Sequence, residues 1–189
     1  AGMAKEGMIP VIPIYSSFYQ RAYDQVIHDV AMQNLPVIMC VDRAGCVGAD
    51  GETHQGTLDM AFFRLVPNLT IMAPKDFKEL EDMLEFAVKL NKPVIIRYPR
   101  GGEDSKVKFE SHENIELGKA EVLKKIINEE KSSKTKILQK IGDKVFNNKT
   151  QRERVTIIAI GKMVARAMDI GQKLQEKMDV EVINARFLK

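Results

Sequence analysis

The sequence predicts an α/β fold in which a parallel sheet is flanked by helices and is followed by the start of a second α/β domain. Over residues 8–100, short apolar runs alternate with amphipathic segments of helical length. Strands that are separated by helices pair in parallel through right-handed crossovers. A second strand–helix–strand pattern begins at residue 155, after a lysine-rich stretch.

The first predicted strand covers residues 9–15 and leads into a helix over residues 17–34. Either Ser16 or Ser17 suits the helix N-cap, because a serine hydroxyl can accept a hydrogen bond from a free backbone amide of the first turn. The helix is amphipathic, since apolar residues recur at every fourth position, at Phe18, Ala22, Val26 and Val30.

The second predicted strand, residues 36–42, is almost entirely apolar, which is typical of a parallel strand that is buried on both faces. It leads into a polar, glycine-rich loop over residues 42–56 and then into a short helix near residues 57–65. A third strand over residues 69–73 is stopped by Pro74, because proline cannot donate a ladder hydrogen bond.

Asp76 is the predicted N-cap of a second long helix. The buried face of this helix is formed by Leu80, Met83, Leu84, Phe86, Ala87 and Leu90. The fourth strand, residues 93–98, is stopped by the sequence Pro-Arg-Gly-Gly at residues 99–102. Because the four strands are parallel, all of them should end at the same edge of the sheet.

The loop over residues 42–56 is the strongest functional signal in the sequence. It holds four glycines, two aspartates, one arginine, one glutamate and one histidine. Loops that leave the carboxyl ends of parallel strands carry the chemistry of many α/β proteins. We therefore expect Tyr15, Arg43 and Arg100 to converge, from three strand ends, on the loop that carries Asp50 and His54.

Two interpretations of these charged residues are open from the sequence. A guanidinium offers planar, permanently charged donors, so Arg43 and Arg100 suit a phosphate group. Alternatively, they pair with Asp42 or Asp50 at the surface. His54 suits a proton shuttle or a transition-state donor, because the histidine pKa lies near neutrality, or it is hydrogen-bonded to its own turn.

Other chemistry-bearing residues have simpler explanations. Asp50, Glu52 and His54 stand at alternate positions, but three ligands this close, without a distant fourth, are a weak metal signal, so no metal site is expected. His28 is predicted on the polar face of the first helix, where solvation or a subunit contact explains it. Phe18 is most simply a core residue.

Composition narrows the classes of function. The hydrophobic share of 44% and charged share of 29% are typical of a soluble globular protein, and no apolar run is long enough to span a membrane. Cys40 and Cys46 do not make a disulfide framework, so we expect a reducing, cytoplasmic setting.

The basic balance of the chain has a local origin. Residues 124–154 carry ten Lys or Arg against four Asp or Glu, so the segment is about +6 and the remainder about −3. The segment lacks the regularly spaced aromatic residues of a nucleic-acid surface, and no nucleic-acid partner is expected.

We divide the chain into three parts. Residues 1–102 form the first α/β domain, residues 103–154 a linker with a lysine-rich insertion, and residues 155–189 the beginning of a second domain. The linker holds one predicted strand, residues 115–123, and a partly helical stretch at residues 134–146.

The second domain is predicted to contain a strand over residues 155–161, a helix from about residue 163 to 177, and a strand over residues 180–187. A single unit of this kind buries too little apolar surface to be stable alone, so we expect part of a larger domain.

Four segments carry a resemblance to a known family: residues 14–30, which read Ile-Tyr-Ser-Ser-Phe-Tyr-Gln-Arg-Ala-Tyr-Asp-Gln-Val-Ile-His-Asp-Val, the loop 42–56, the Arg-Tyr-Pro-Arg-Gly of residues 97–101, and residues 182–187. They resemble the 1-deoxy-D-xylulose-5-phosphate synthases, and the resemblance covers residues 1–123 and 155–189. Transketolase shares only the Asp-Gly-x-Thr-His core of the loop and lacks its Asp-Arg-Ala-Gly lead-in.

The resemblance implies a transketolase-like enzyme that depends on thiamine diphosphate and Mg²⁺. Such an enzyme condenses pyruvate with D-glyceraldehyde 3-phosphate, with loss of carbon dioxide, in isoprenoid precursor and thiamine biosynthesis. Tyr15, Arg43 and Arg100 would hold the phosphorylated acceptor. Asp50 and His54 would contact hydroxyl groups and handle protons near the reacting carbon. The family works as a homodimer.

The resemblance also implies a cofactor face on this chain, which would be a pyrimidine-binding domain. Phe18 would stack on the aminopyrimidine ring, and Arg21 and His28 would lie close by on the same helix. Two departures stand against full activity. The glutamate that activates the aminopyrimidine precedes the segment that resembles residues 1–4, and the Gly-Asp-Gly…Asn pattern that binds diphosphate and Mg²⁺ does not occur here. We therefore expect these 189 residues to be inactive alone.

Two other interpretations are open. One is another transketolase-type ketol or acyl transferase subunit, such as the β chain of a 2-oxoacid dehydrogenase, against which the lead-in at residues 42–45 argues. The other is a non-catalytic phosphosugar-binding module. Against it stands the joint presence of five candidate site residues, Tyr15, Arg43, Asp50, His54 and Arg100.

Overall fold

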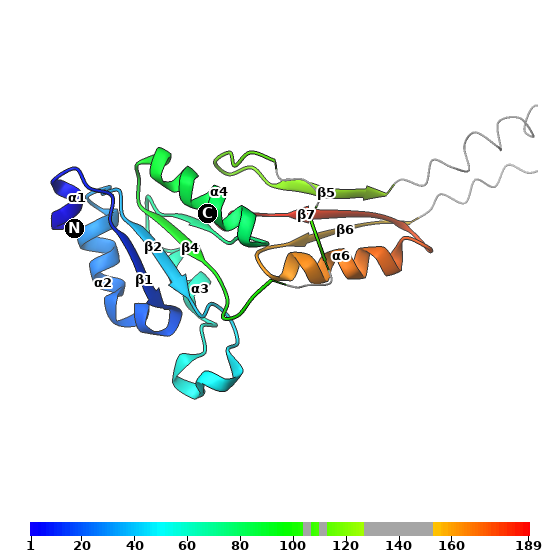
Figure 1. Cartoon of the computed structure of the whole chain (residues 1–189), viewed down its shortest axis with the longest axis horizontal. Coiled ribbons are helices and arrows are strands. Elements are labelled where there is room, and N and C mark those ends of the chain that lie inside the picture. The colour runs from blue at the N-terminus through cyan, green and yellow to red at the C-terminus, as the bar shows by residue number, and fades with distance from the viewer. Residues whose placement is uncertain (104–106, 110–112, 127–152) are drawn as a thin grey trace, which may run out of the picture.

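The computed structural model describes residues 1–103, 107–109, 113–126 and 153–189. Figure 1 shows two sheets that lie one beyond the other along the long axis. The first has four parallel strands in the order β1-β2-β4-β3, and the second has three strands in the order β5-β7-β6. The predicted α/β class, a parallel sheet flanked by helices and followed by a second unit, is confirmed.

The four strands of the first sheet all match predicted strands. They are β1 (Val11–Tyr15), β2 (Ile38–Asp42), β3 (Thr70–Met72) and β4 (Val94–Arg97). Ile38 pairs with Val11 on one side and with Val94 on the other, so the strands lie side by side without stagger. Their carboxyl ends consequently meet at one edge, as the sequence predicts.

Alternate residues of the buried strands face opposite layers of the protein. Met39, Val41 and Ile95 belong to one apolar cluster with the helical segment after β1 and with α3 (Asp59–Phe63). Ile38 and Ile96 belong to the other, with α4 (Phe77–Leu90). The sheet is therefore covered on both faces, which explains its continuous apolar strands.

The helical segment after β1 is less regular than the predicted helix over residues 17–34. It passes through a 3₁₀ turn, η1 (Ser16–Ala22), a short α2 (Tyr23–Gln25) and a π-helical stretch, η2 (Val26–Ala31). The predicted serine cap is wrong, because the tight first turn takes Ser16 and Ser17 inside the helix. Both hydroxyl oxygens are buried without a protein hydrogen-bond partner.

The predicted cap of the second long helix is confirmed. The Asp76 carboxylate accepts a hydrogen bond from the Glu79 backbone N–H at 2.7 Å, and α4 begins at the next residue after Asp76. The helix ends where Asn91 adopts a left-handed conformation, with φ of 51°. A short helix, α1 (Gly2–Lys5), precedes β1.

The second sheet is mixed. β6 (Arg154–Ala159) and β7 (Asp179–Asn184) are parallel, and β5 (Glu121–Ile126) is antiparallel to β7. α6 (Met163–Leu174) packs on β7, where a Cβ on Gly171 would lie 2.9 Å from a Val182 methyl group.

The division of the chain into domains stays a prediction, but its middle part holds more structure than a linker. The predicted strand over residues 115–123 begins only at Glu121, and the strand it forms belongs to the second sheet. Residues 117 and 118 form a turn instead. The helical stretch predicted at residues 134–146 lies outside the described residues.

The end of the chain returns to the first sheet. The strand predicted over residues 180–187 ends at Asn184, and the following residues run antiparallel along the edge of β3. Ala73 N–H donates to Arg186 O at 3.0 Å, and Leu188 N–H donates to Ile71 O at 2.9 Å. The second unit is thus hydrogen-bonded to the first.

A cluster of buried polar side chains lies where the two sheets meet. We call it the junction cluster; its members are Lys75, Glu79, Glu121, Asn184 and Arg186. Lys75 Nζ lies 2.7 Å from Glu121 Oε2, and Arg186 Nε lies 2.8 Å from Glu79 Oε1. Asn184 Nδ2 donates to both carboxylates. Two cations therefore balance two anions in a buried space, which such charges require.

The junction cluster predicts a pH-dependent stability. Burial alone would raise the pKa of Glu121, but hydrogen bonds from Lys75 and Asn184 and the charge of Arg186 lower it below its ordinary value. Since the folded-state pKa is the lower one, this stabilisation is complete above the unfolded value of about 4.3 and is lost as pH falls through the folded value.

We expect Glu121→Gln to lower the free energy of unfolding by about 3 kcal/mol near pH 7, because it leaves two buried cations, Lys75 and Arg186, with Glu79 as their one remaining carboxylate in the junction cluster. The difference from the unmodified protein should shrink below about pH 4. Urea unfolding at both pH values measures this. Glu116→Gln, in an exposed pair with Lys119, is the matched control and should change little. A difference that is independent of pH would contradict the assignment.

Candidate functional site

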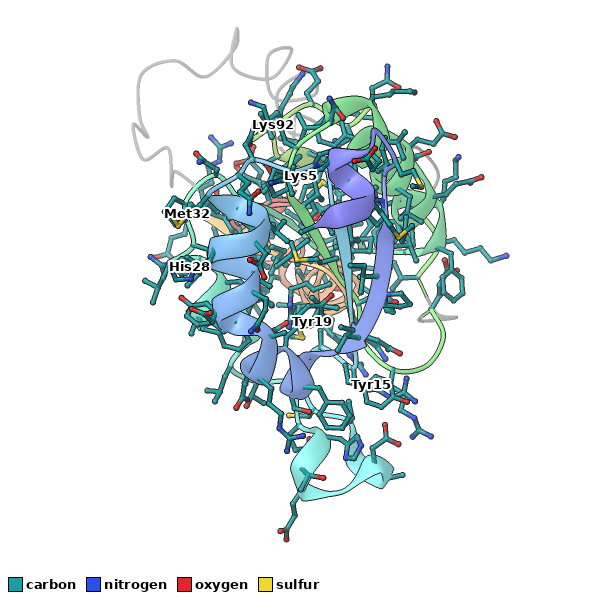
Figure 2. The ribbon with its side chains drawn as sticks, turned by 90° about the vertical axis from the view of Figure 1, so that its left-hand side faces the viewer. Lys5, Tyr15, Tyr19, His28, Met32 and Lys92 are labelled. Atoms are coloured by element: carbon teal, nitrogen blue, oxygen red, sulfur yellow. The ribbon has the colours of Figure 1, made fainter. Side chains whose placement is uncertain are left out.

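The candidate site lies at the carboxyl edge of the first sheet. Tyr15 is the last residue of β1, and Arg43 follows the last residue of β2. Arg100 lies three residues beyond the end of β4. Figure 2 shows Tyr15 at the end of its strand, beside the loop that hangs from this edge. The parallel sheet thus delivers all three side chains to one place.

The loop over residues 42–56 closes on itself at its base. Gly45 N–H donates to Gly56 O at 2.7 Å, and Gly56 N–H donates to Gly45 O at 2.8 Å. Between them lie two single 3₁₀ turns, η3 (Gly48–Asp50) and η4 (Glu52–His54). Gln55 braces the loop, because its side chain accepts from Val47 N–H and donates to Gly51 O. The loop is therefore held by its own hydrogen bonds.

Three aromatic rings form one wall of the site. Tyr15 and Phe18 are stacked, with ring centroids 5.5 Å apart. The His54 ring meets both edge-on, at 5.2 Å from Phe18 and 5.7 Å from Tyr15. Phe18 is 40% exposed, so it is not the core residue that its helical spacing suggests.

Asp50 joins the two arginines. Its Oδ2 accepts from Arg43 Nε at 3.0 Å, and its Oδ1 lies 3.3 Å from Arg100 Nε. Arg43 also donates to Asp42 at 2.5 Å and lies over the Tyr15 ring, 4.0 Å from its centroid. The ion pairs that the sequence left open are thus present in this structure, while phosphate binding by the same arginines stays a prediction.

These contacts shape the electrostatics of the site. Desolvation opposes the charge of Arg43, but hydrogen bonds to Asp50 and Asp42 outweigh it and raise the pKa of Arg43. Burial, together with nearby Cys40 and Asp42, raises the pKa of Tyr98 to about 12, so this phenol stays protonated at neutral pH. His54 Nδ1 lies 2.9 Å from Thr53 Oγ1, a hydrogen bond within its own turn.

Two of the predicted cofactor-binding residues, Arg21 and His28, are exposed on the helical segment after β1. His28 is exposed, and its Nδ1 lies 2.8 Å from Asp24 Oδ1, as expected for the polar face of its helix. Figure 2 shows His28 on the outer side of the helical segment, away from Tyr15. Arg21 is exposed at the end of η1, three residues after Phe18.

Neither a metal cluster nor a membrane span is found in the part of the chain that the structure describes. No three His, Cys, Asp or Glu side chains there, including Asp50, Glu52 and His54, gather closely enough to hold a metal ion. No helix among the described residues has the length and apolar character needed to cross a bilayer.

A pocket of about 410 Å³ opens between the turn before α4 and Gly101, and its lining contains none of the aromatic wall or of the two arginines.

One ion pair beside the loop was not predicted. Arg97, the last residue of β4, binds Asp59, the first residue of α3, through two contacts at 2.8 and 3.2 Å. Asp59 is 1% exposed. An arginine at the end of a buried strand indicates that an acidic partner lies nearby. Sequence spacing does not identify that partner, because it is 38 residues away.

Known proteins are similar to this chain in sequence. Residues 1–102 match the family model "Transketolase, pyrimidine binding domain", and residues 145–189 match "Transketolase, C-terminal domain". The chain is 45% identical to a 1-deoxy-D-xylulose-5-phosphate synthase from Clostridium perfringens (strain SM101) and 44% identical to one from Natranaerobius thermophilus. Both similarities cover 100% of this chain and 26% of the relative, so the chain spans about a quarter of their length.

Solved structures show the same fold at lower sequence identity. A structure described as "Split gene transketolase, inactive beta4 tetramer" is 24% identical, with a TM-score of 0.73, and covers 98% of this chain and 52% of its own. A transketolase from Pichia stipitis in complex with sedoheptulose 7-phosphate is 19% identical, with a TM-score of 0.66, over 94% of this chain and 23% of its own. Because both identities are below 25%, these two comparisons support the fold alone.

The closure of the loop predicts a strict requirement for glycine at position 56. A Cβ there would lie 2.2 Å from Arg43 O and 2.7 Å from Ser16 Cβ. We expect Gly56→Ala to lower the free energy of unfolding by about 2 kcal/mol or more, because backbone must move to admit the methyl group. Gly102→Ala, where a Cβ meets nothing within 4 Å, is the control. Equal urea midpoints for the two variants would contradict this packing argument.

Proposed function

This chain belongs to the transketolase family, and from that premise we propose that it is part of a thiamine diphosphate-dependent synthase. The complete enzyme would condense pyruvate with D-glyceraldehyde 3-phosphate to 1-deoxy-D-xylulose 5-phosphate, with loss of carbon dioxide. Relatives of that name, 42–46% identical over the whole chain, support the choice of reaction. The observation that carries it is the convergence of Tyr15, Arg43, Asp50, His54 and Arg100 at one edge of the sheet.

The two arginines are the proposed binding site for the acceptor's phosphate. The Nε atoms of both arginines lie against the Asp50 carboxylate. The two guanidinium groups are therefore close enough to bind one anion with several oxygen atoms together. A guanidinium has five N–H donors, and these contacts leave others for a ligand. Arg100 is 47% exposed and is therefore open to solvent. A bound phosphate would compete with Asp50 for the arginines or share them with it.

Asp50 and His54 are the proposed residues for hydroxyl contacts and proton handling. Because His54 Nδ1 is hydrogen-bonded to Thr53, we assign Nε2 to the substrate. The edge contacts with Tyr15 and Phe18 hold the imidazole ring in place. With this orientation His54 can donate or accept a proton at a hydroxyl group of the acceptor.

The aromatic wall fits one part of the implied cofactor. Phe18 is stacked on Tyr15 and is still 40% exposed, so its ring can pack against the flat pyrimidine of thiamine diphosphate. When bound, that cofactor supplies the electron sink for the carbanion chemistry. We propose Arg21 as a neighbour of the pyrimidine, whereas His28 lies on the outer side of its helix.

Other parts of the complete enzyme would hold the rest of the cofactor. We propose that the diphosphate and Mg²⁺ bind to residues outside these 189, because no Gly-Asp-Gly…Asn pattern occurs in the sequence. We further propose a cytoplasmic homodimer. The 189 residues should then show no turnover unless they are joined to, or mixed with, a synthase N-terminal half.

The phosphate assignment is tested in that joined protein with pyruvate and glyceraldehyde 3-phosphate. We expect Arg43→Ala or Arg100→Ala to raise the acceptor KM by about 10- to 100-fold, because a hydrogen bond between charged groups contributes about 1.5–3 kcal/mol. The pyruvate KM should stay nearly constant. Arg166→Ala, at an exposed position of α6, is the matched control.

Unphosphorylated glyceraldehyde provides a second control, because its KM should not respond to either arginine. An unchanged KM for the phosphorylated acceptor would refute the phosphate assignment. Turnover by the 189 residues alone would refute the proposal that the remaining cofactor site lies elsewhere.

A further inference from the structure

We propose that Asp59 and Arg97 form a positioning pair, which holds the returning end of the loop 42–56 against the strand end that leads to Arg100. The pair touches neither the aromatic wall nor Asp50 in any contact described above, so its action would pass through the backbone. Its effect on the reaction rests on the proposed function, while its effect on the loop does not.

The geometry of the pair is that of a strong, buried interaction. Arg97 Nε lies 2.8 Å from Asp59 Oδ2, and Arg97 Nη2 lies 3.2 Å from Asp59 Oδ1, so both carboxylate oxygens are engaged. The Asp59 side chain is 2% exposed and that of Arg97 is 14% exposed. A carboxylate so buried is stable as an anion only with such a partner.

The pair adds to the hydrogen bonds that hold the two ends of the loop to each other and to the end of β4. At the start of the loop, Ala44 N–H donates to Tyr98 O, the residue after Arg97. At its end, Gly56 is hydrogen-bonded to Gly45, and Asp59 follows three residues later. Both ends of the loop are therefore tied to the same short segment, Arg97 and Tyr98, at the carboxyl end of β4.

That segment also leads to Arg100, which binds Asp50 from the middle of the loop. The placement of Asp50 and His54 relative to Arg100 consequently depends on where α3 is fixed. The pair with Arg97 is the contact that fixes the first residue of α3 to β4.

A purely structural role would have different consequences. α3 has other attachments, since Phe63 is buried against Tyr19 and Lys189 Nζ donates to the carbonyls of Arg64 and Val66 just after the helix. These contacts hold the far end of α3 without Asp59. Loss of the pair should therefore free the near end of the helix and the loop before it, rather than unfold the domain.

The experiment compares two changes of a buried carboxylate to an amide. Asp59→Asn removes the negative charge of the positioning pair, and Glu79→Gln removes the negative charge of an equally buried carboxylate in the junction cluster. Arg97→Lys keeps the charge but loses the bidentate geometry, and it serves if Asp59→Asn does not fold. All variants are made in the joined protein described above.

We expect Asp59→Asn and Arg97→Lys to raise the acceptor KM about tenfold, which corresponds to about 1.4 kcal/mol, with the pyruvate KM nearly unchanged. Glu79→Gln should lower the melting temperature but leave the acceptor KM within about twofold. An acceptor KM that follows the melting temperature in all three variants would overturn the positioning role.

Amide hydrogen exchange gives a measurement that needs no activity. We expect exchange at Gly45 and Gly56 to be at least about tenfold faster in Asp59→Asn than in Glu79→Gln. Equal exchange in the two variants would overturn the proposal. If the unmodified joined protein fails to turn over pyruvate and glyceraldehyde 3-phosphate, the proposed function fails, and the exchange result still decides whether the pair holds the loop.

Discussion

Parallel pairing of four buried strands is the constraint on which the rest of the structure depends. Because β1, β2 and β4 run in the same direction without stagger, Tyr15, Arg43 and Arg100 leave the sheet at one edge. Apolar packing on both faces of the sheet prevents the strands from slipping by a residue, since a slip would turn each side chain to the wrong layer. The geometry of the site is therefore a consequence of core packing.

Charge balance is the second organising principle. At the sheet edge, the carboxylates of Asp42 and Asp50 lie against the guanidinium groups, so the cations are held in place before any ligand arrives. At the junction of the two sheets, two cations and two carboxylates are buried together, and the end of the chain adds to the edge of β3. The second unit is thus attached to the first through polar contacts that require a specific arrangement.

Local patterns predicted the four strands of the first sheet, the cap at Asp76 and the convergence of the five candidate residues, because each depends on neighbours within a few positions or on strand direction. Other features could not be predicted in this way. The preference of serine for N-caps gave a wrong prediction at Ser16, because the 3₁₀ turn η1 already begins at this residue and Tyr15 occupies the N-cap. Phe18 has the spacing of a core residue but is 40% exposed, because its ring contacts Tyr15 and His54 at the site and is not part of an apolar core cluster. The partners Asp59 and Arg97 are 38 positions apart.

The sequence by itself determined the α/β class, the direction of the strands in the first sheet and the residues that reach the site, since periodicity and strand ends are local properties of the chain. Only the tertiary structure decided that Asp50 bridges the two arginines, that Asp59 pairs with Arg97, and that the segment after β7 returns to β3. The physical reason is that ion pairs and ladder hydrogen bonds depend on distances in space. Those distances are set by how the sheets and helices pack, and residue spacing does not encode them.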